Sequence, residues 1–184
     1  VMKQRKNRAH FVCFSGCGAT YELTESVTNC TRCGALLDVE QKLDVLAERS
    51  GEEWKQLFDD RRATAMFPMD SGVWSKKEWV YPQLSMESIV SLGEGNSPLI
   101  PCKGIADKLG LESLMVKGCG VSHTGSFKDL GMTVLVSAVQ EMRRQGKGPR
   151  AIGCASTGDT SAALAAYAAA AGIPAVVMLP RGKI

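Results

Sequence analysis

The chain has 184 residues, of which 45% are hydrophobic and 22% are charged, and its formal net charge is +3. This composition is ordinary for a globular protein, and the near-balanced charge argues against a strongly basic nucleic-acid binder. The longest apolar run, at 162–171, is too short for a membrane span, and no signal peptide opens the chain, so we expect a cytoplasmic protein without a membrane partner.

Four of the seven cysteines lie close together near the amino terminus: Cys13, Cys17, Cys30 and Cys33, in the pattern C-x3-C-x12-C-x2-C. Four thiolates at such spacing favour a closed tetrahedral zinc site, which would be structural and would supply the folding energy of a small unit. We therefore predict a four-cysteine unit over residues 1–40, with short strands at 11–14 and 36–39. Reduced cysteines in a small β-unit, or a redox switch, are the alternatives.

Residues 41–84 read as a helical and then irregular connector. Ser50 and Glu53 form the pattern of a capping box, which predicts a helix that begins there and turns Trp54 toward its apolar face. The stretch 67–82 is rich in aromatic residues and carries two prolines, so we expect a packed but irregular segment.

Residues 85–184 alternate between strands and helices. We predict strands at 114–117, 151–155 and 175–179 and helices at 127–145 and 160–171. This order argues for an α/β fold, a parallel sheet with flanking helices. Ligands bind such sheets at the carboxyl ends of the strands, where two polar loops are expected.

The first polar loop leads into Lys128. Ser126 and Asp129 have capping-box spacing, which places Lys128 in the first turn of a helix. An ammonium is unfavourable at that end of the helix dipole, so the position favours the neutral amine that reacts with an aldehyde cofactor. The local sequence alone favours the alternative, an ordinary solvated lysine at a helix start.

The second polar loop spans 156–160. Its hydroxyls, together with the free amide groups of the following helix, suit a carboxylate or a phosphate. A plain helix cap is the alternative, because Ser, Thr and Asp are all common there.

Three segments occur in this order along the chain: 94–99, 123–129 and 156–160. Their sequences and order resemble those of the threonine synthases, a group of fold-type-II (tryptophan-synthase-β-like) pyridoxal-phosphate enzymes. The resemblance covers roughly 72–184. The stretch 74–79 is similar to the form also found in plants. The cysteine-rich start resembles the zinc-ribbon-like extension of some members.

The resemblance implies a site and a reaction. Lys128 would hold pyridoxal phosphate and act as acid and base, with Ser126 and Phe127 beside the cofactor. Asp159 stands where many members place an Asn near the cofactor's 3-hydroxyl. The residues implied for the substrate carboxylate are Ser156, Thr157, Gly158 and Thr160. The implied reaction converts O-phosphohomoserine and water to threonine and phosphate in a homodimer, located in the plastid stroma if the source is a plant.

Family members carry a glycine-rich cofactor-phosphate loop and a residue facing the pyridine nitrogen later in the chain, and neither is found here. We therefore expect a fragment with an incomplete site that is inactive alone. Arg181 and Lys183 are weaker candidates for a phosphate, since solvated loop residues look the same.

Several rival interpretations stay open. A threonine dehydratase or a cysteate-synthase-like enzyme would keep Lys128 and the carboxylate loop. A homologue that only binds the cofactor is another, and so is a zinc-ribbon module with an inactive remnant. Such a module could bind nucleic acid through the basic residues at the amino terminus: Lys3, Arg5, Lys6 and Arg8. Four charges make a weak argument, so we expect no nucleic-acid partner.

Overall fold

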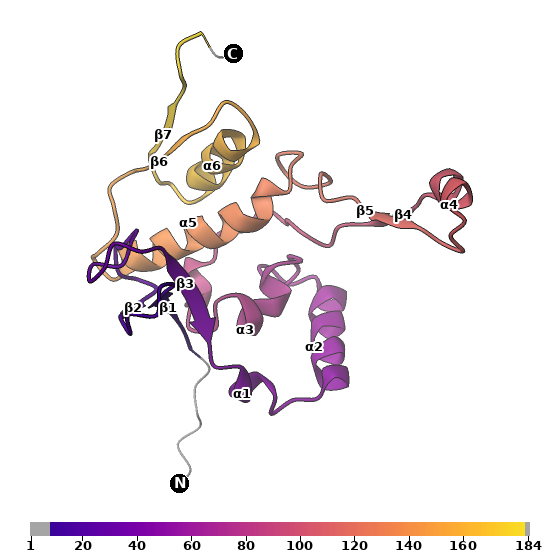
Figure 1. The fold of residues 1–184 in the computed structure, drawn as a ribbon, viewed down its shortest axis with the longest axis horizontal. Coiled ribbons are helices and arrows are strands. Elements are labelled where there is room, and N and C mark those ends of the chain that lie inside the picture. The colour runs from indigo at the N-terminus through magenta and orange to yellow at the C-terminus, as the bar shows by residue number, and fades with distance from the viewer. Residues whose placement is uncertain (1–7, 183–184) are drawn as a thin grey trace.

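The computed structural model describes residues 8–182 (Figure 1), so Lys3, Arg5, Lys6 and Lys183 lie outside the described residues. The elements in chain order are β1 (Ala9–Cys13), β2 (Thr20–Glu22), β3 (Leu37–Gln41), α1 (Leu43–Leu46), α2 (Gly51–Thr64), η1 (Trp74–Lys76), α3 (Lys77–Val80), η2 (Met86–Ser88), β4 (Leu99–Pro101), α4 (Lys103–Leu109), β5 (Met115–Lys117), α5 (Lys128–Arg144), β6 (Ile152–Ala155), α6 (Asp159–Ala170) and β7 (Ala175–Met178).

The amino-terminal part is an antiparallel sheet in the order β2-β1-β3. In the central strand, Phe11 is paired with Tyr21 on one side and with Val39 on the other. The side chain of Gln83 fastens this sheet to the connector, because its Oε1 accepts the Ala9 amide at 3.0 Å and its Nε2 donates back to the Ala9 carbonyl.

Helix α2 begins as the sequence predicts. The Glu53 amide donates to Ser50 Oγ at 3.2 Å, and the Ser50 amide donates to Glu53 Oε2 at 2.7 Å, which confirms the capping box. Trp54 is buried and stacks on Phe58 with ring centroids 5.5 Å apart, while Trp79 meets it edge-on at 5.6 Å. The aromatic contact attaches α2 to the irregular segment that follows it.

That segment packs against helix α5 through a buried polar seam. Trp74 is fully buried, and its Nε1 donates to Thr133 Oγ1 at 2.7 Å. Thr133 donates in turn to the Val90 carbonyl at 2.7 Å, and the Val90 amide donates to Ser137 Oγ at 2.8 Å. Side chains of α5 thus satisfy backbone groups of a segment with little secondary structure of its own.

The main core lies between α5 and α6. Val136 of α5 and Tyr167 of α6 are fully buried, and Met132, Leu164 and Ile173 pack in the same cluster. Helix α6 connects two parallel strands, with Ile152 paired to Ala175 and Ala155 to Met178. The α/β class predicted from the sequence is therefore confirmed. None of the helices in residues 8–182 combines the length and apolar content that a membrane crossing requires.

The strand expected at 114–117 does not join the parallel sheet. It forms β5, which pairs antiparallel with β4 through Leu99 and Lys117, in a separate two-stranded sheet. Together with α4, these strands extend away from the other helices (Figure 1). The expectation failed because β4, a three-residue strand ending in proline, is nearer along the chain and satisfies the backbone of β5.

Candidate functional site

The first polar loop presents Lys128 as the first residue of α5. Ser126 is buried, and its Oγ accepts the Lys128 amide at 3.1 Å. Ser122 supports the same turn, because its Oγ donates to the Ser126 carbonyl at 2.8 Å. Ser126 therefore positions the backbone of the lysine and satisfies one of the free amides at the start of the helix.

Asp129 does not form the capping box predicted with Ser126. Helix α5 begins one residue later than that arrangement needs, so Asp129 is its second residue instead of its third. The fully buried carboxylate accepts instead from the Thr124 amide at 2.8 Å and from Thr124 Oγ1 at 2.5 Å. Asp129 thereby fixes the loop that leads to Lys128.

The amine of Lys128 lies over the ring of Phe127, 4.4 Å from its centroid. Within the part of the chain that the structure describes, it makes no hydrogen bond and no ion pair, and the side chain is half-buried. A cation–π contact of this kind is weak at an exposed site. The amine therefore forms no ion pair with a carboxylate among the described residues, and it is available to bind a ligand at the amino-terminal end of the helix.

The second polar loop lies where the parallel strands end. Ser156 and Thr157 follow β6, and with Met178 and Leu179 at the end of β7 they line an open hollow of about 580 Å³. The Gly158 amide donates to Ser156 Oγ at 3.3 Å, and α6 begins at Asp159 without a side-chain cap. The first amides of α6 thus keep no side-chain acceptor, which suits an anionic ligand.

The last two residues of this loop, which begin α6, are exposed to different extents. Asp159 is exposed, whereas Thr160 is half-buried in the first turn of α6. Arg181, the weaker phosphate candidate, is exposed just after the strand end. The described hydrogen bonds stay within each of the two loops and do not link Lys128 to the 156–160 segment.

The first residue of the motif 94–99 is a buried carboxylate to which the sequence interpretation gave no role. Glu94 is fully buried and accepts hydrogen bonds from Ser71 Oγ at 2.6 Å, from the Leu92 amide at 2.9 Å and from the Tyr167 hydroxyl at 2.7 Å. Burial, reinforced by the Glu94 charge, raises the pKa of Tyr167. The only available signal was an acidic residue in the recognised motif, which does not reveal burial.

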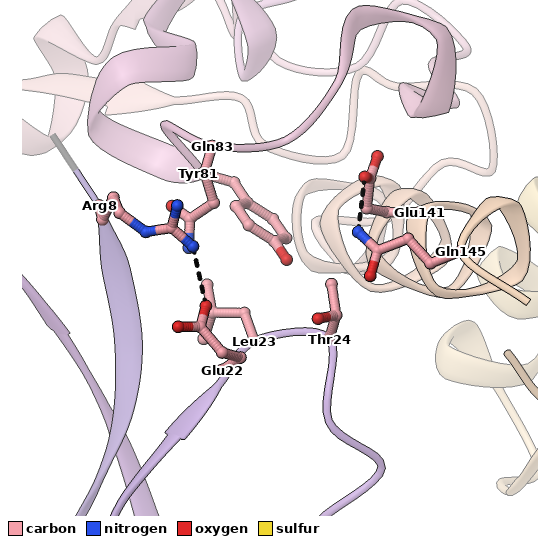
Figure 2. Close-up of a pocket in the computed structure, with 8 residues that line it drawn as sticks. All are labelled: Arg8, Glu22, Leu23, Thr24, Tyr81, Gln83, Glu141 and Gln145. Carbon is pink, nitrogen blue, oxygen red and sulfur yellow. Dashed lines mark hydrogen bonds and ion pairs between the residues drawn. The ribbon is translucent and has the colours of Figure 1, made fainter. Parts of the chain in front are cut away.

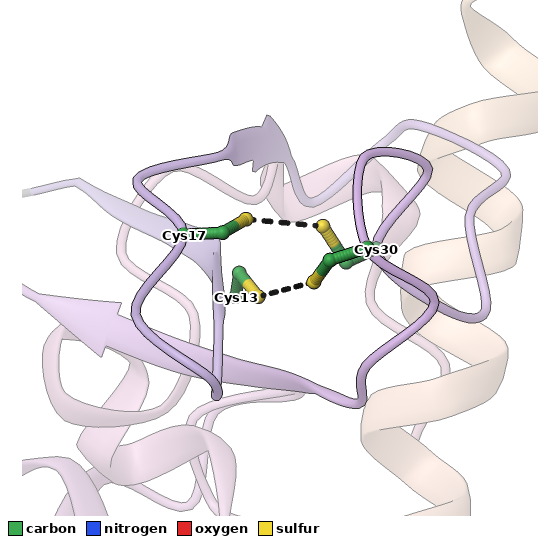
Figure 3. A group of neighbouring side chains, drawn as sticks. Cys13, Cys17 and Cys30 are labelled. Carbon is green, nitrogen blue, oxygen red and sulfur yellow. Dashed lines mark hydrogen bonds between the residues drawn. The ribbon is translucent and has the colours of Figure 1, made fainter.

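The four predicted cysteines meet in one cluster (Figure 3). All four Sγ atoms lie within 4.8 Å of one another, with Cys13 and Cys33 3.4 Å apart and Cys17 and Cys30 3.5 Å apart. A tetrahedron with Zn–S bonds of about 2.3 Å has S···S edges of about 3.8 Å. The donor set and its spacing therefore fit a zinc ion.

Tyr21 supports this cluster and was missed in the sequence. Its hydroxyl donates to Cys30 Sγ at 3.4 Å and lowers the pKa of that thiol to about 6. The Thr31 amide donates to the Tyr21 oxygen at 2.9 Å and holds the ring in place. A hydrogen bond to a ligand sulfur stabilises the thiolate form, which is the form that binds metal.

Comparison with known proteins identifies a matching family and relatives of similar sequence. The model of the family "Pyridoxal-phosphate dependent enzyme" matches residues 90–184. The chain is 52% identical over 166 residues to "Threonine synthase 2, chloroplastic" of Arabidopsis thaliana, covering 90% of this chain and 32% of that protein. It is 39% identical over 168 residues to "Threonine synthase" of Methanocaldococcus jannaschii, covering 91% and 37%. The chain thus spans about a third of the length of these relatives.

Proposed function

This chain belongs to the family of pyridoxal-phosphate-dependent enzymes, and from that premise we propose that it supplies the lysine and the carboxylate-binding loop of a threonine synthase. The reaction is the conversion of O-phosphohomoserine and water to threonine and phosphate. Relatives that carry the name threonine synthase and align with nine-tenths or more of this chain support this choice within the family.

The observation that carries the proposal is the Lys128 amine. It starts a helix, is free of any carboxylate partner among residues 8–182, and stands on a turn fixed by Ser126 and Asp129. A lysine that reacts with an aldehyde must present an unpaired amine in a defined place. A structural lysine would more commonly pair with an acid or extend into solvent.

Pyridoxal phosphate, when bound, supplies the electron sink that stabilises negative charge at substrate carbons. In this proposal Lys128 holds the cofactor and then carries protons to and from the carbon chain of the substrate. Phe127 offers an apolar surface next to the amine, and Ser126 keeps the helix start in register. The protein therefore contributes orientation and a single acid/base group at this point.

The loop at 156–160 holds the substrate in this proposal. The hydroxyls of Ser156, Thr157 and Thr160, with Gly158 and the first amides of α6, receive the α-carboxylate. Asp159, which is exposed at the start of that helix, is the residue that the family resemblance assigns to the cofactor's 3-hydroxyl. The hollow at the ends of β6 and β7 supports this placement, because ligands of parallel sheets bind at that edge.

Substrate specificity is the direct test. The full-length holoenzyme is assayed with O-phosphohomoserine, O-phosphoserine and threonine, and we expect turnover with the first and threonine as product. Turnover of threonine alone would identify a dehydratase, and use of phosphoserine would identify a cysteate-synthase-like enzyme. Either result would overturn the proposed reaction and leave the family assignment intact.

The role of Lys128 is tested with a matched pair of variants. Lys128→Ala should lower kcat by a factor of at least about 1,000, because the proton-transfer group is removed. Lys103→Ala, which removes an exposed lysine paired with Asp107 on α4, should leave kcat unchanged. Equal activity of the two variants would contradict the assignment of Lys128.

We further propose that Cys13, Cys17, Cys30 and Cys33 bind one structural zinc ion. The sulfur spacing and the hydrogen bond from Tyr21 support it. Metal analysis of protein purified without chelator should give one zinc per chain. Protein that is folded and free of zinc would refute the site and favour the reduced-cysteine alternative.

A homodimer and a plastid location complete the proposal. The first rests on the family resemblance, and the second on the chloroplastic name of the 52% identical relative. Light scattering of the holoenzyme should give twice the mass of one protomer. If the source is a plant, organelle fractionation should place the protein in the stroma; otherwise we expect the cytosol.

A further inference from the structure

A cavity of about 190 Å³ lies between the four-cysteine unit and the carboxyl end of helix α5 (Figure 2). Three parts of the chain contribute its polar groups: the amino-terminal sheet and the residues next to its strands with Arg8, Glu22 and Thr24, the connector with Tyr81 and Gln83, and helix α5 with Glu141 and Gln145. At about 30 Å³ per water, the space holds roughly six waters, or a molecule of similar size. A nucleotide or a peptide does not fit.

The hydroxyl of Tyr81 is the unexplained group in this cavity. The residue is 3% exposed, and among the described residues its hydroxyl has no hydrogen-bond partner. Figure 2 shows the hydroxyl directed into the space between Thr24 and Glu141. Burial, with smaller contributions from the charges of Glu141 and Glu22, raises the pKa of Tyr81 to about 12, so the hydroxyl remains a donor. Buried hydroxyls in folded proteins almost always have a partner.

The cavity has an ion pair on one side and a single carboxylate on the other. Arg8 lies on one side and donates to Glu22 at 3.0 Å, which leaves further guanidinium N–H groups for another acceptor. Glu141 lies on the opposite side (Figure 2) and accepts from Gln145 Nε2 at 3.0 Å and from Ser85. Partial burial opposes its ionisation, but these hydrogen bonds hold the pKa of Glu141 below its usual range. Among the described residues no cation forms an ion pair with it within 4.0 Å, although the charge of Lys77 acts on it from farther away.

We propose that this cavity binds a small zwitterionic α-amino acid. Its ammonium group would face Glu141, its carboxylate would face Arg8, and the Tyr81 hydroxyl would donate to it in between. The remaining guanidinium N–H groups of Arg8, which is ion-paired with Glu22, lie at one end, the Glu141 carboxylate lies at the other, and the Tyr81 donor lies between them. An acceptor group followed by a cationic group in one small molecule would satisfy all three. A simple amine would leave the free Arg8 donors unused, and a simple carboxylate would leave the charge of Glu141 without a cation in contact with it.

The cavity is separate from the Lys128 loop. Glu141 follows Lys128 by thirteen positions on the same helix, which corresponds to about 20 Å along its axis. A ligand in the cavity would bridge the four-cysteine unit and the far end of the helix that starts at Lys128. The inference therefore does not depend on the proposed reaction.

Calorimetric titration of the zinc-loaded holoenzyme with L-alanine, ethylamine and propionate tests the proposal. The last two compounds each lack one of the charged groups of alanine. We expect saturable binding of alanine in the millimolar range or tighter, and binding of ethylamine and propionate weaker by about tenfold or more, the usual effect of losing one charged hydrogen bond. The absorbance of the bound cofactor, followed in the same titration, separates any binding at Lys128.

Two variants locate the binding. Tyr81→Phe keeps the ring and removes the hydroxyl, and Glu141→Gln removes the charge; each should weaken alanine binding by about tenfold. Glu112→Gln, a matched change at an exposed position outside the cavity, should bind like the wild type. Thermal melts identify any variant that fails to fold. The proposal is overturned if alanine does not bind, or if folded Tyr81→Phe and Glu141→Gln bind it as tightly as the wild type.

Discussion

Replacing Asp129 with asparagine tests whether one buried carboxylate holds the loop that presents Lys128. Asp129 is fully buried and accepts two hydrogen bonds from Thr124, at 2.8 and 2.5 Å. Asparagine keeps the shape but retains one acceptor oxygen, and its amide group then faces a donor. Hydrogen bonds to charged groups contribute roughly 1.5–3 kcal/mol, so the loss of one is the main effect.

A smaller effect comes from the helix itself. Asp129 is in the first turn of α5, where a negative charge stabilises the helix by about 0.3–1 kcal/mol. Together, the two effects predict that Asp129→Asn lowers the free energy of unfolding by about 2–4 kcal/mol. Because the loop also positions Lys128, we expect kcat of the holoenzyme to fall by about tenfold, since a misplacement of about 1 Å can cost up to about a hundredfold.

Urea unfolding followed by circular dichroism measures the change, with Asp107→Asn as the control. Asp107 is an exposed residue of α4 paired with Lys103 at 2.9 Å, and losing such a pair costs about 0.5 kcal/mol or less. If Asp129→Asn is as stable as this control and equally active, the carboxylate does not hold the loop. If stability falls and kcat is unchanged, its role is structural only.

Three further changes follow from the same structure. Gly72→Ala would place a methyl group 2.0 Å from a backbone nitrogen, so urea unfolding should show a loss of at least about 2 kcal/mol, whereas Gly104→Ala, in open helix, should gain up to about 1 kcal/mol. The pKa of Tyr81 is raised from 10.0 to about 12 in the folded protein, so the unfolded chain loses this proton first as the pH rises. The contribution of Tyr81 to the free energy of unfolding is therefore complete below pH 10 and is lost as the pH rises to 12. The unfolding free energy of the wild type should therefore fall by about 2 kcal/mol more than that of Tyr81→Phe over this window; parallel curves would contradict this. Tyr21→Phe removes the donor to Cys30 Sγ, and competition with a chelator should show zinc held about tenfold more weakly; an unchanged zinc affinity would show that this hydrogen bond does not support the metal site.

The regular elements were predictable where one local signal determined them. The helix expected at 127–145 is α5 at Lys128–Arg144, because a continuous apolar face ends at a glycine-containing turn. The partner of β5 was not predictable in this way. Strand pairing is a choice between distant segments, and β4 is too short to carry a pattern of its own.

The site shows the same division. The position of Lys128 at a helix start follows from its neighbours in sequence, and so does the meeting of the four cysteines, whose spacing is local. The partner of Asp129 does not follow, because a shift of the helix start by one residue redirects its carboxylate from Ser126 to Thr124. Tyr21 reaches Cys30 only through the strand pairing of β1 and β2, which spacing alone does not reveal.

Glu94 shows why the connector and the α/β part should unfold together. Its carboxylate accepts hydrogen bonds from Ser71 in the connector and from Tyr167 in α6, which are 96 positions apart in the sequence. A fully buried charge is tolerated only while it is hydrogen-bonded, so detaching the connector would leave the carboxylate with fewer donors inside the core. Local unfolding of either part therefore destabilises the folded state of the other part, because Glu94 loses hydrogen-bond donors. The motif 94–99 is held between them, and the loop of Lys128 depends on both through α5, whose Thr133 binds Trp74.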